Sequence, residues 1–374
     1  MKIEILKENL KIGLNIVERI IGKNLSLPIL DNILIKIEDS FLNLISTDLE
    51  MVIKLWVLTK VIKKGEAVVP VKVFSNFISS LPNEKILIET REQNLYIECQ
   101  NFKTQIQGYN PEEFPIIPEF NNEYFLEIDN KKFCQSLSQV INIASLSQTR
   151  LEITGIYFTF FKENIIIAAT DSFRLAEKKI LLEKSIKEER SFILPQKSVK
   201  EIINILEEKE GFLKICFSKN QALFEFPLKE VKHPQIQITS RLIEGEYPHY
   251  QDIIPNQFKT QVTVKKEDFL NQIKIASLFS NRNNEVKILV DCKNKQIEIF
   301  SQNPNIGENK SSLFAKIEGD PLEVSFNYKF LIDGLLNIKS SEVVFGISKE
   351  DGPCILKPVS DDSYIYVVMP IKSI

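Results

Sequence analysis

Apolar and polar residues alternate along most of the chain, and the alternation gives way to helical spacing at six places. Alternation predicts a strand, whereas apolar residues three or four positions apart predict a helix. Three segments, beginning at Met1, Tyr124 and Thr260, share one order in which an alternating stretch leads into a helical one. Their apolar helical positions are Leu10, Leu14 and Val17, then Phe133, Leu137 and Ile141, and then Phe269, Ile273 and Ala276.

A second kind of unit lies between these segments and consists of a short strand, a helix and a returning strand. It occurs as AVVPVKVFSNFISSLPNEKILIE, as SFILPQKSVKEIINILEEKEGFLKICF and as LEVSFNYKFLIDGLLNIKSSEVVFGI. Pro70 and Pro195 stand at strand–helix junctions, where proline is compatible with the start of a helix. The pattern recurs every 120 to 135 residues or so, which is the size of a domain. We therefore expect an α+β chain of three tandem repeats, residues 1–121, 122–255 and 256–374, each with two helices and many strands.

Composition narrows the class of protein. The chain has 374 residues, 44% apolar and 26% charged, which is typical of a globular protein of two or three domains. It has no apolar run long enough to span a membrane, and its first ten residues carry charges where a signal peptide would be apolar. Five dispersed cysteines without a CxxC motif predict reduced thiols in the cytoplasm. The two histidines argue against a metal site or a histidine-based catalytic site but leave a carboxylate-based enzyme open. For the chain as a whole we expect no metal, no cofactor and no catalytic residue.

Charge is distributed unevenly between the predicted helices and the rest of the chain. The net charge is −3, but the six predicted helices carry +6 and the rest of the chain −9. If the helices shared one face, that face would attract a polyanion through its phosphates without reading sequence. The alternative is that these are ordinary lysine-rich helix surfaces.

The stretch IIIAATDSFRLAEKKI ends a strand with Thr170, Asp171, Ser172 and Arg174 close together. As a hydrolase site it would use Ser172 or Asp171 as nucleophile, but it has no GxSxG motif and no neighbouring histidine. As a tight turn it would pair Arg174 with Asp171. As a third interpretation, it borders an apolar pocket that accepts a peptide from another protein.

Two further stretches bear on the third interpretation. The C-terminal DDSYIYVVMPIKSI ends on an apolar strand that contains methionine, a residue suited to an adaptable pocket wall. The connector EGEYPHYQDIIP (244–255) joins the second and third repeats. The three stretches would line one groove at a domain junction, a common position for ligand sites. Alternatively, they are a last strand, a linker and a turn.

Several stretches resemble the bacterial DNA polymerase III beta subunits, the sliding clamps. They are LPILDNILIKIEDSFLNLISTDLEM, ATDSFRLA, EGEYPHYQDIIP, FNYKFLIDGLL and YVVMPIK, and the resemblance runs along the whole chain. It implies DNA-clamp domains in which two helices pack on antiparallel sheets, and a head-to-tail dimeric ring with the helices inside. The basic helices would then face the DNA.

The resemblance also implies what the protein does. Its partners would be a second copy of itself, double-stranded DNA bound without regard to sequence, the replicative polymerase alpha subunit, the clamp loader and other proteins with a clamp-binding motif, and no membrane. The protein would be a non-catalytic processivity subunit, cytoplasmic and associated with the nucleoid. Two alternatives remain open, a hydrolase using Asp171 or Ser172 and a monomeric three-repeat scaffold without a DNA role.

By resemblance, partner peptides would bind between the second and third domains. The implied pocket residues are Ile153, Thr170, Ser172, Phe173, Arg174, Leu175, Pro248, Ile253, Asn327, Phe330, Val367, Met369, Pro370, Ile371 and Lys372. Asp171 would brace the pocket rim. The family's usual Gly-His is Ser172-Phe173 here, its terminal arginine is Lys372, and a connector arginine is Asp252. These departures predict a different peptide preference.

The resemblance implies two more surfaces. DNA contacts would come from Lys7, Lys11, Arg19, Lys23, Asn24, Lys72, Lys131, Lys132, Arg150, Lys197, Lys200, Lys266, Lys274 and Lys329. The dimer interface would include Lys103, Ile106, Leu278 and Phe279, with the stretch NFKTQIQGY as an edge strand that pairs across it. Because the third domain offers few acids there, we expect an interface that depends more on apolar packing than on salt bridges.

Overall fold

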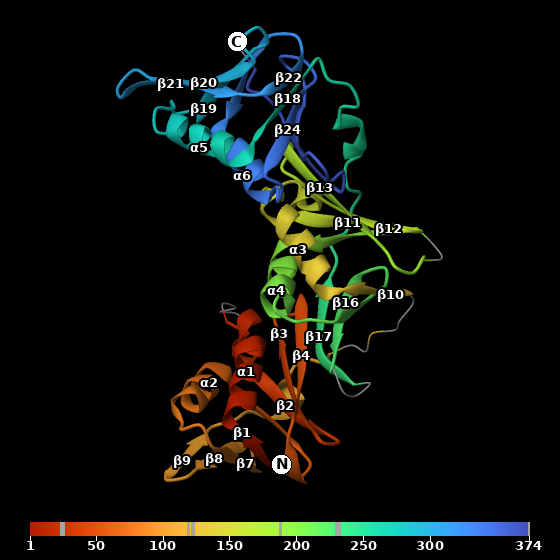
Figure 1. The fold of residues 1–374 in the computed structure, drawn as a ribbon. Helices are drawn as coiled ribbons and strands as arrows, with labels where there is room; N and C mark the ends of the chain where they lie inside the picture. The colour runs from red at the N-terminus through yellow and green to blue at the C-terminus, as the bar shows by residue number, and fades with distance from the viewer. Residues whose placement is uncertain (23–26, 118–119, 121–123, 187–188, 229–232, 373–374) are drawn as a thin grey trace. The chain divides into compact units, whose positions relative to one another are not determined.

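The computed structural model describes residues 1–374 except 23–26, 118–119, 121–123, 187–188, 229–232 and 373–374 (Figure 1). The described residues form α-helices in all six predicted segments. These are α1 (Lys7–Val17), α2 (Val71–Ser80), α3 (Asn130–Val140), α4 (Gln196–Leu206), α5 (Lys266–Ser277) and α6 (Tyr328–Asn337). Short 3-10 turns cover Glu18–Ile20, Pro28–Asp31, Pro111–Glu113, Ile141–Ile143, Leu151–Thr154 (η5) and Tyr250–Ile253 (η6).

The two predicted repeating units are both present. Strands β1 (Lys2–Leu6), β10 (Tyr124–Asp129) and β18 (Thr260–Lys265) lead directly into α1, α3 and α5. Helices α2, α4 and α6 lie between strand pairs, which are β6 (Glu66–Pro70) and β7 (Lys85–Arg91), β14 (Arg190–Pro195) and β15 (Phe212–Phe217), and β23 (Leu322–Asn327) and β24 (Glu342–Ile347). Pro70 and Pro195 end their strands immediately before the helices, as predicted. The threefold repeat of secondary structure is therefore confirmed.

The chain folds into two compact units, of which the first contains Met1–Cys134 and Lys197–Leu242. Its five-stranded antiparallel sheet has the order β5-β1-β7-β8-β9, and its eight-stranded sheet has the order β10-β15-β16-β17-β4-β3-β2-β6. The strands not yet given are β2 (Asn32–Glu38), β3 (Phe41–Thr47), β4 (Met51–Leu58), β5 (Lys60–Lys63), β8 (Asn94–Cys99), β9 (Phe102–Ile106), β16 (Gln221–Pro227) and β17 (Pro234–Arg241).

The eight-stranded sheet joins two of the predicted repeats. Strand β17 pairs with β4, and Ile236 lies opposite Leu55 in the ladder. Helix α1 packs on this sheet at Gly13, where an added Cβ would lie only 2.9 Å from Leu44 and 3.0 Å from Leu55. The absence of a side chain thus allows close helix–sheet contact. Because the compact units divide the chain differently, the boundaries at 121 and 255 stay predictions.

The second unit contains Gln135–Gln196 and Ile243–Ile374. Its nine-stranded sheet has the order β14-β11-β12-β13-β26-β25-β24-β18-β22, and its four-stranded sheet has the order β21-β20-β19-β23. The remaining strands are β11 (Gly155–Phe161), β12 (Asn164–Thr170), β13 (Arg174–Leu181), β19 (Glu285–Asp291), β20 (Gln296–Asn303), β21 (Gly307–Phe314), β22 (Lys316–Gly319), β25 (Cys354–Pro358) and β26 (Tyr364–Val368). Strand β13 pairs with β26, which brings Leu175 opposite Val367.

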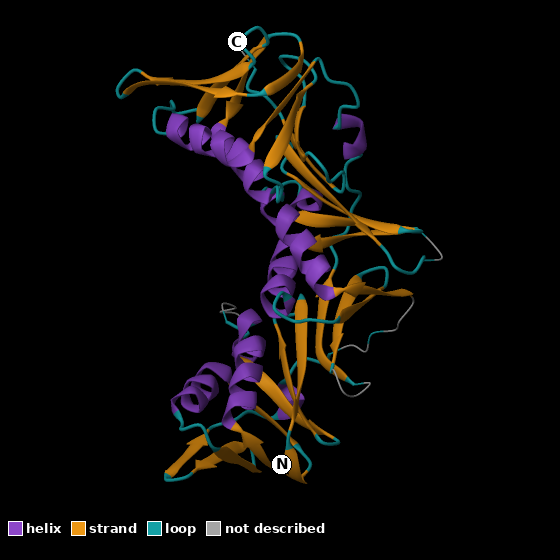
Figure 2. Cartoon of the chain, viewed as in Figure 1, coloured by secondary structure: helices purple, strands orange, loops and turns teal. Residues whose placement is uncertain are grey.

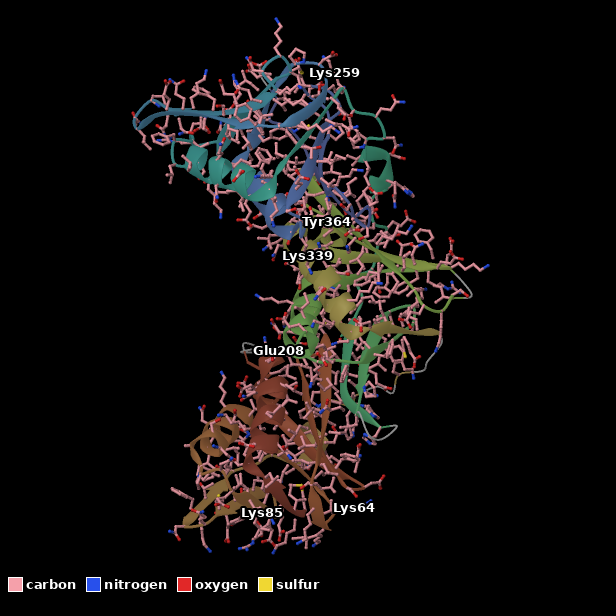
Figure 3. All side chains as sticks on the ribbon, viewed as in Figure 1. Lys64, Lys85, Glu208, Lys259, Lys339 and Tyr364 are labelled. Carbon is pink, nitrogen blue, oxygen red and sulfur yellow. The ribbon has the colours of Figure 1, made fainter. Side chains whose placement is uncertain are left out.

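Both units bury the apolar faces of their helices against strands. In the first unit, α1 and α2 lie together on one side of the strands (Figure 2). The predicted core positions Leu10, Leu14 and Val17 are fully buried. In the second unit, Tyr364, which is labelled in Figure 3, is only 1% exposed. No helix among the described residues is long and apolar enough to cross a membrane.

Candidate functional site

The polar residues after β12 form a tight turn. The Thr170 hydroxyl donates to the Arg174 carbonyl at 2.7 Å and accepts from the Ser172 amide at 3.1 Å. Asp171 Oδ1 accepts from the amides of Phe173 and Arg174 at 2.9 and 3.0 Å. Ser172 has φ +78°, a left-handed conformation that most side chains avoid. Asp171 therefore closes the turn and presents Ser172 and Phe173 at its tip.

Arg174 occupies a fixed position beside this turn. Its Nε donates to Asp171 Oδ2 at 2.9 Å, which is the local pair that the sequence predicts, and its Nη1 donates to Asp333 of α6. The guanidinium also lies over the Phe330 ring, 4.7 Å from the centroid. Burial works against the charge, but Tyr366 and the two carboxylates outweigh it and raise the pKa of Arg174 above its ordinary value. The side chain is a permanently charged, immobilised part of the wall.

A cavity of about 370 Å³ opens beside Arg174, entirely within the second unit. Its lining residues are Arg150, Thr170, Ser172, Phe173, Arg174, Leu175, Pro248, Tyr250, Ile253, Val367 and Met369. The turn, the connector and the C-terminal strand thus meet, as the third interpretation of the sequence requires. The Met369 amide donates to the Phe173 carbonyl at 2.9 Å and ties the C-terminal segment to the turn. The cavity size is within the range of small-ligand sites.

Nine of the predicted pocket residues line this cavity, and the other six do not. Ile153 is 2% exposed and belongs to the core beneath the wall, with Leu175 and Val367. Phe330 supports the wall without lining the cavity, because its ring packs against the Arg174 guanidinium. The ring centroid of Phe330 lies 6.4 Å from that of Phe173. Asn327 caps α6 by accepting from the Lys329 amide at 3.1 Å. The rest are the C-terminal residues that follow the lining strand, namely Pro370, Ile371 and Lys372.

A backbone hydrogen bond explains why the last C-terminal residues do not line the cavity. The Ile371 amide donates to the Ser325 carbonyl at 2.8 Å, which directs the segment toward β23. Lys372 is exposed. Residues 373–374 lie outside the described part of the chain.

The structure adds residues to the pocket that sequence reasoning missed. Arg150, a predicted DNA contact, also lines the cavity, and its Nη1 donates to Ser172 Oγ at 3.2 Å. Tyr250 lines the cavity and donates to Glu177 at 2.7 Å. Asp333 holds Arg174 from α6. Tyr250 belongs to the connector 244–255, which the sequence predicts as part of the groove, whereas no local sequence pattern indicates a role for Asp333.

The geometry gives no support to nucleophilic catalysis at the turn. The three hydrogen bonds that the Asp171 carboxylate makes to described residues hold the turn and Arg174. The Ser172 hydroxyl contacts Arg150, a cation that cannot act as a general base. Among the described residues, no group of three or more His, Cys, Asp or Glu side chains could hold a metal ion.

The predicted DNA-contacting cations fall mainly on helices. Lys7 and Lys11 lie on α1, Lys72 on α2, Lys131 and Lys132 on α3, Lys197 and Lys200 on α4, Lys266 and Lys274 on α5, and Lys329 on α6. Lys23 and Asn24 lie outside the described residues.

Some of these cations already have partners within the chain. Arg19 Nε donates to Glu201 at 2.6 Å, and Lys197 pairs with Asp48. Lys266 Nζ donates to the Ile338 carbonyl at 3.0 Å. Five of the predicted cations are exposed lysines that make no ion pair with the described residues, namely Lys72, Lys131, Lys200, Lys274 and Lys329.

The predicted interface residues lie on or near sheet edges. Strand β9, with Lys103 and Ile106, is an edge of the five-stranded sheet. Lys103 pairs with Glu98 at 3.1 Å, and Ile106 is only 5% exposed, so it packs mainly within its own unit. Leu278, which follows α5, is 68% exposed, whereas Phe279 is half-buried.

Comparison with known proteins matches the chain to three family models in succession. Residues 1–118, 127–249 and 251–372 match the N-terminal, central and C-terminal domains of the DNA polymerase III beta subunit. The Staphylococcus epidermidis protein named beta sliding clamp is 29% identical over 373 residues, which covers 96% of each chain.

Solved structures agree with the family models over the full length of the chain. The DNA polymerase sliding clamp of Bacillus subtilis is 25% identical, with a TM-score of 0.94 over 100% of both chains. The DNA polymerase III beta subunit of Thermotoga maritima is 25% identical, with a TM-score of 0.90 and the same coverage.

Proposed function

Because the chain belongs to the family of DNA polymerase III beta subunits, the beta sliding clamps, we propose that two copies close into a ring around duplex DNA. The succession of three beta-subunit domains along the chain carries this proposal. The ring acts at the nucleoid, in the cytoplasm, as a processivity subunit that performs no catalysis of its own. It tethers the replicative polymerase at the primer end, so that the polymerase copies long stretches without dissociating.

Binding to DNA without sequence preference follows from charge on the helices. Lys72, Lys131, Lys200 and Lys274 are exposed on four different helices and make no ion pair with the described residues. Such cations are available to phosphates, which position a protein on DNA without specifying sequence. A closed ring stays on DNA by topology, so these contacts can be weak enough to permit sliding.

Ring closure would join two sheet edges. Strands β9 and β21 are edges of their sheets and present unpaired backbone groups. We propose that β9 of one copy pairs with β21 of the other, with the exposed Leu278 packed nearby. Lys103 is already paired with Glu98 of its own chain, so the interface depends mainly on apolar packing. A dimer dissociation constant that rises steeply with salt would contradict this.

The cavity beside Arg174 would hold the partners. Leu175, Pro248, Ile253, Val367 and Met369 give it an aliphatic wall. Phe173, 62% exposed, gives it an aromatic rim. We propose that the polymerase alpha subunit, the clamp loader and other clamp-binding proteins dock a short apolar peptide here. The probe peptide for this site is a fluorescein-labelled Gly-Ser-Leu-Leu-Phe-Gly, chosen to match the aliphatic wall and the aromatic rim.

Retention on circular DNA tests the function. Dissociated subunits are allowed to reassemble in the presence of nicked circular DNA, and the complex is isolated by gel filtration in high salt. A ring remains with the circle and slips off after a single cut linearises it. Retention after the cut would indicate an ordinary DNA-binding protein. A species that sediments as a monomer and does not remain on the circle would support the scaffold alternative, whereas hydrolase activity is not favoured by the turn or by the family.

A further inference from the structure

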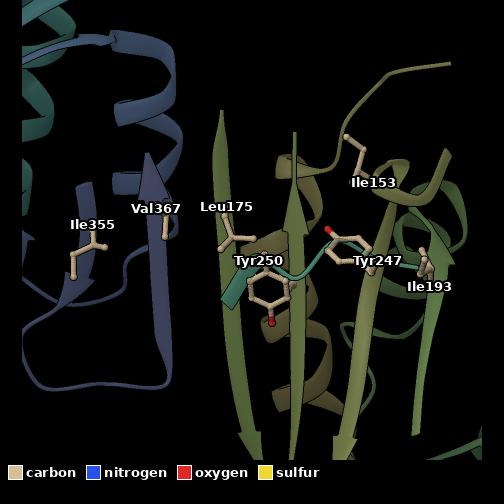
Figure 4. Packing of buried hydrophobic residues seen from close by; sticks show 8 residues of the cluster. Ile153, Leu175, Ile193, Tyr247, Tyr250, Ile355 and Val367 are labelled. Carbon is tan, nitrogen blue, oxygen red and sulfur yellow. The ribbon is translucent and has the colours of Figure 1, made fainter. Parts of the chain in front are cut away.

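The connector 244–255 is anchored to the sheet of the second unit by two tyrosines. Tyr247 is 8% exposed and stacks on Tyr157, with ring centroids 4.6 Å apart and planes inclined by 4°. Tyr250 is 1% exposed and meets both rings edge-on. Figure 4 shows Tyr250 between Leu175 and Tyr247, over the strands of this sheet. The connector is therefore a packed part of the wall.

The Tyr250 hydroxyl has a specific partner beneath the wall. It donates to Glu177 Oε2 at 2.7 Å, and Glu177 lies on β13, three residues after Arg174. The residues opposite Glu177 in the neighbouring strands are Ala168 and Ile365, which carry no charge. Burial raises the pKa of Glu177, while the Tyr250 hydrogen bond and the charge of Lys179 act in the opposite direction. An acid in these surroundings is costly to bury, and Tyr250 offsets part of that cost.

The position of Tyr250 bears directly on the cavity. Tyr250 lines the cavity itself, as do Pro248, two residues before it, and Ile253, three residues after it. The Tyr250 amide also donates to the Pro248 carbonyl at 2.8 Å, which fixes the two residues relative to each other. A displacement of the Tyr250 ring would therefore move the connector side of the wall.

We propose that Glu177 is a positioning residue for peptide docking, which accepts the Tyr250 hydrogen bond and so holds Pro248 and Ile253 in the wall of the cavity. The proposal rests on the peptide-binding function proposed above. Glu177 lies beneath the wall and acts through Tyr250. Preorganisation of this kind strengthens binding by reducing the ordering required when a ligand arrives.

A double-mutant cycle with the probe peptide tests the proposal on the full-length protein. Glu177→Ala and Tyr250→Phe should each weaken binding by about three- to tenfold, because each removes a hydrogen bond to a charged group. The double variant should bind as weakly as either single variant, since both changes remove one shared interaction. Tyr96→Phe, a change at a partly exposed tyrosine of the first unit, is the control and should leave affinity unchanged. Additive effects in the double variant would overturn the proposal.

Hydrogen exchange without peptide separates positioning from simple destabilisation. Amides in 244–255 should exchange faster in both single variants, while amides of β24 and β25 keep the wild-type rate. Unchanged exchange in the connector would overturn the proposal. Wild-type protein that binds no probe peptide would overturn the proposed peptide function and this inference together. Wild-type binding with unaltered affinity in both variants would overturn this inference alone.

Dependence on pH supplies a readout that a purely structural role would not move. Glu177→Gln keeps an acceptor for Tyr250 but cannot gain a proton. Within the part of the chain that the structure describes, the charged or titratable groups that act on Glu177 are Tyr250 from the connector and Lys179 from its own strand. As pH falls from about 7.5 to 4.5, the ordinary pKa of a glutamate, protonation of Glu177 should weaken wild-type binding relative to the glutamine variant, because burial raises the pKa of Glu177 above that value. A constant ratio of the two affinities over this range would overturn the proposal. Use of the ratio removes the contribution of every other group that the two proteins share.

Discussion

The guanidinium carbon of Arg174 lies 4.7 Å from the centroid of the Phe330 ring. This contact joins β13 to α6, and the Arg174–Asp333 ion pair joins the same two elements. The centroid of the Phe330 ring also lies 6.4 Å from that of the Phe173 ring, which forms the rim of the cavity. The position of the rim in this chain is therefore linked to the position of α6.

Replacement of Phe330 by Leu tests this link. Leucine keeps most of the apolar volume but removes the aromatic face that attracts the Arg174 cation. We expect a loss of about 1 kcal/mol in the free energy of unfolding, and weaker binding of the probe peptide in a fluorescence anisotropy titration. Phe212→Leu, at a 51% exposed position of the first unit, is the matched control. Equal behaviour of the two variants would contradict the link.

Two substitutions of Ser172 test whether its backbone conformation or its hydroxyl has the larger effect on stability at the turn. Ser172→Gly should raise the free energy of unfolding by about 1 kcal/mol, because glycine adopts positive φ without steric cost. Ser172→Ala keeps the backbone strain and loses the hydrogen bond from Arg150, so its effect should stay within about 0.5 kcal/mol. Denaturant unfolding monitored by fluorescence measures both. A stabilisation of the same size in the alanine variant would mean that the hydroxyl, not φ, is responsible.

The exposed helical lysines should control the salt dependence of DNA binding. In Lys200→Ala/Lys274→Ala, the slope of log affinity against log salt should fall by about 0.9 for each phosphate contact that is lost. Titrations of a labelled duplex at several salt concentrations measure the slope. The control is Lys316→Ala, whose side chain is 76% exposed on β22 and pairs with Glu318. An equal reduction of slope in the control would show that the effect comes from total charge and not from the helices.

Thiol reactivity should follow burial. Burial raises the pKa of Cys134 and of Cys354 to about 12 and that of Cys216 to about 11, so these thiols are protonated near neutral pH. Cys99 is 2% exposed, whereas Cys292 is only partly buried. In native protein at pH 8, iodoacetamide should modify Cys292 first, and the other four only after denaturation. Peptide mass spectrometry identifies the sites, and native labelling of Cys354 would contradict this expectation.

Secondary structure in this chain was determined by local pattern. The three-residue and four-residue spacing that predicts α1 corresponds to Leu10, Leu14 and Val17, all fully buried. The turn at Asp171 was equally local, since its hydrogen bonds reach residues only two and three positions away. Each of these features depends on neighbours in the sequence, so the local pattern predicted the helix and offered the turn as one of three interpretations.

Tertiary structure alone decided which distant residues meet. Nothing in the sequence pairs β17 with β4, places Asp333 against Arg174 across 159 positions, or sets Tyr250 on Glu177. It likewise places Arg150, a predicted DNA contact, in the wall of the cavity, and buries Ile106 within its own unit. Such contacts depend on how the sheets close in three dimensions, because burial and hydrogen bonding between remote segments are satisfied jointly by the whole fold.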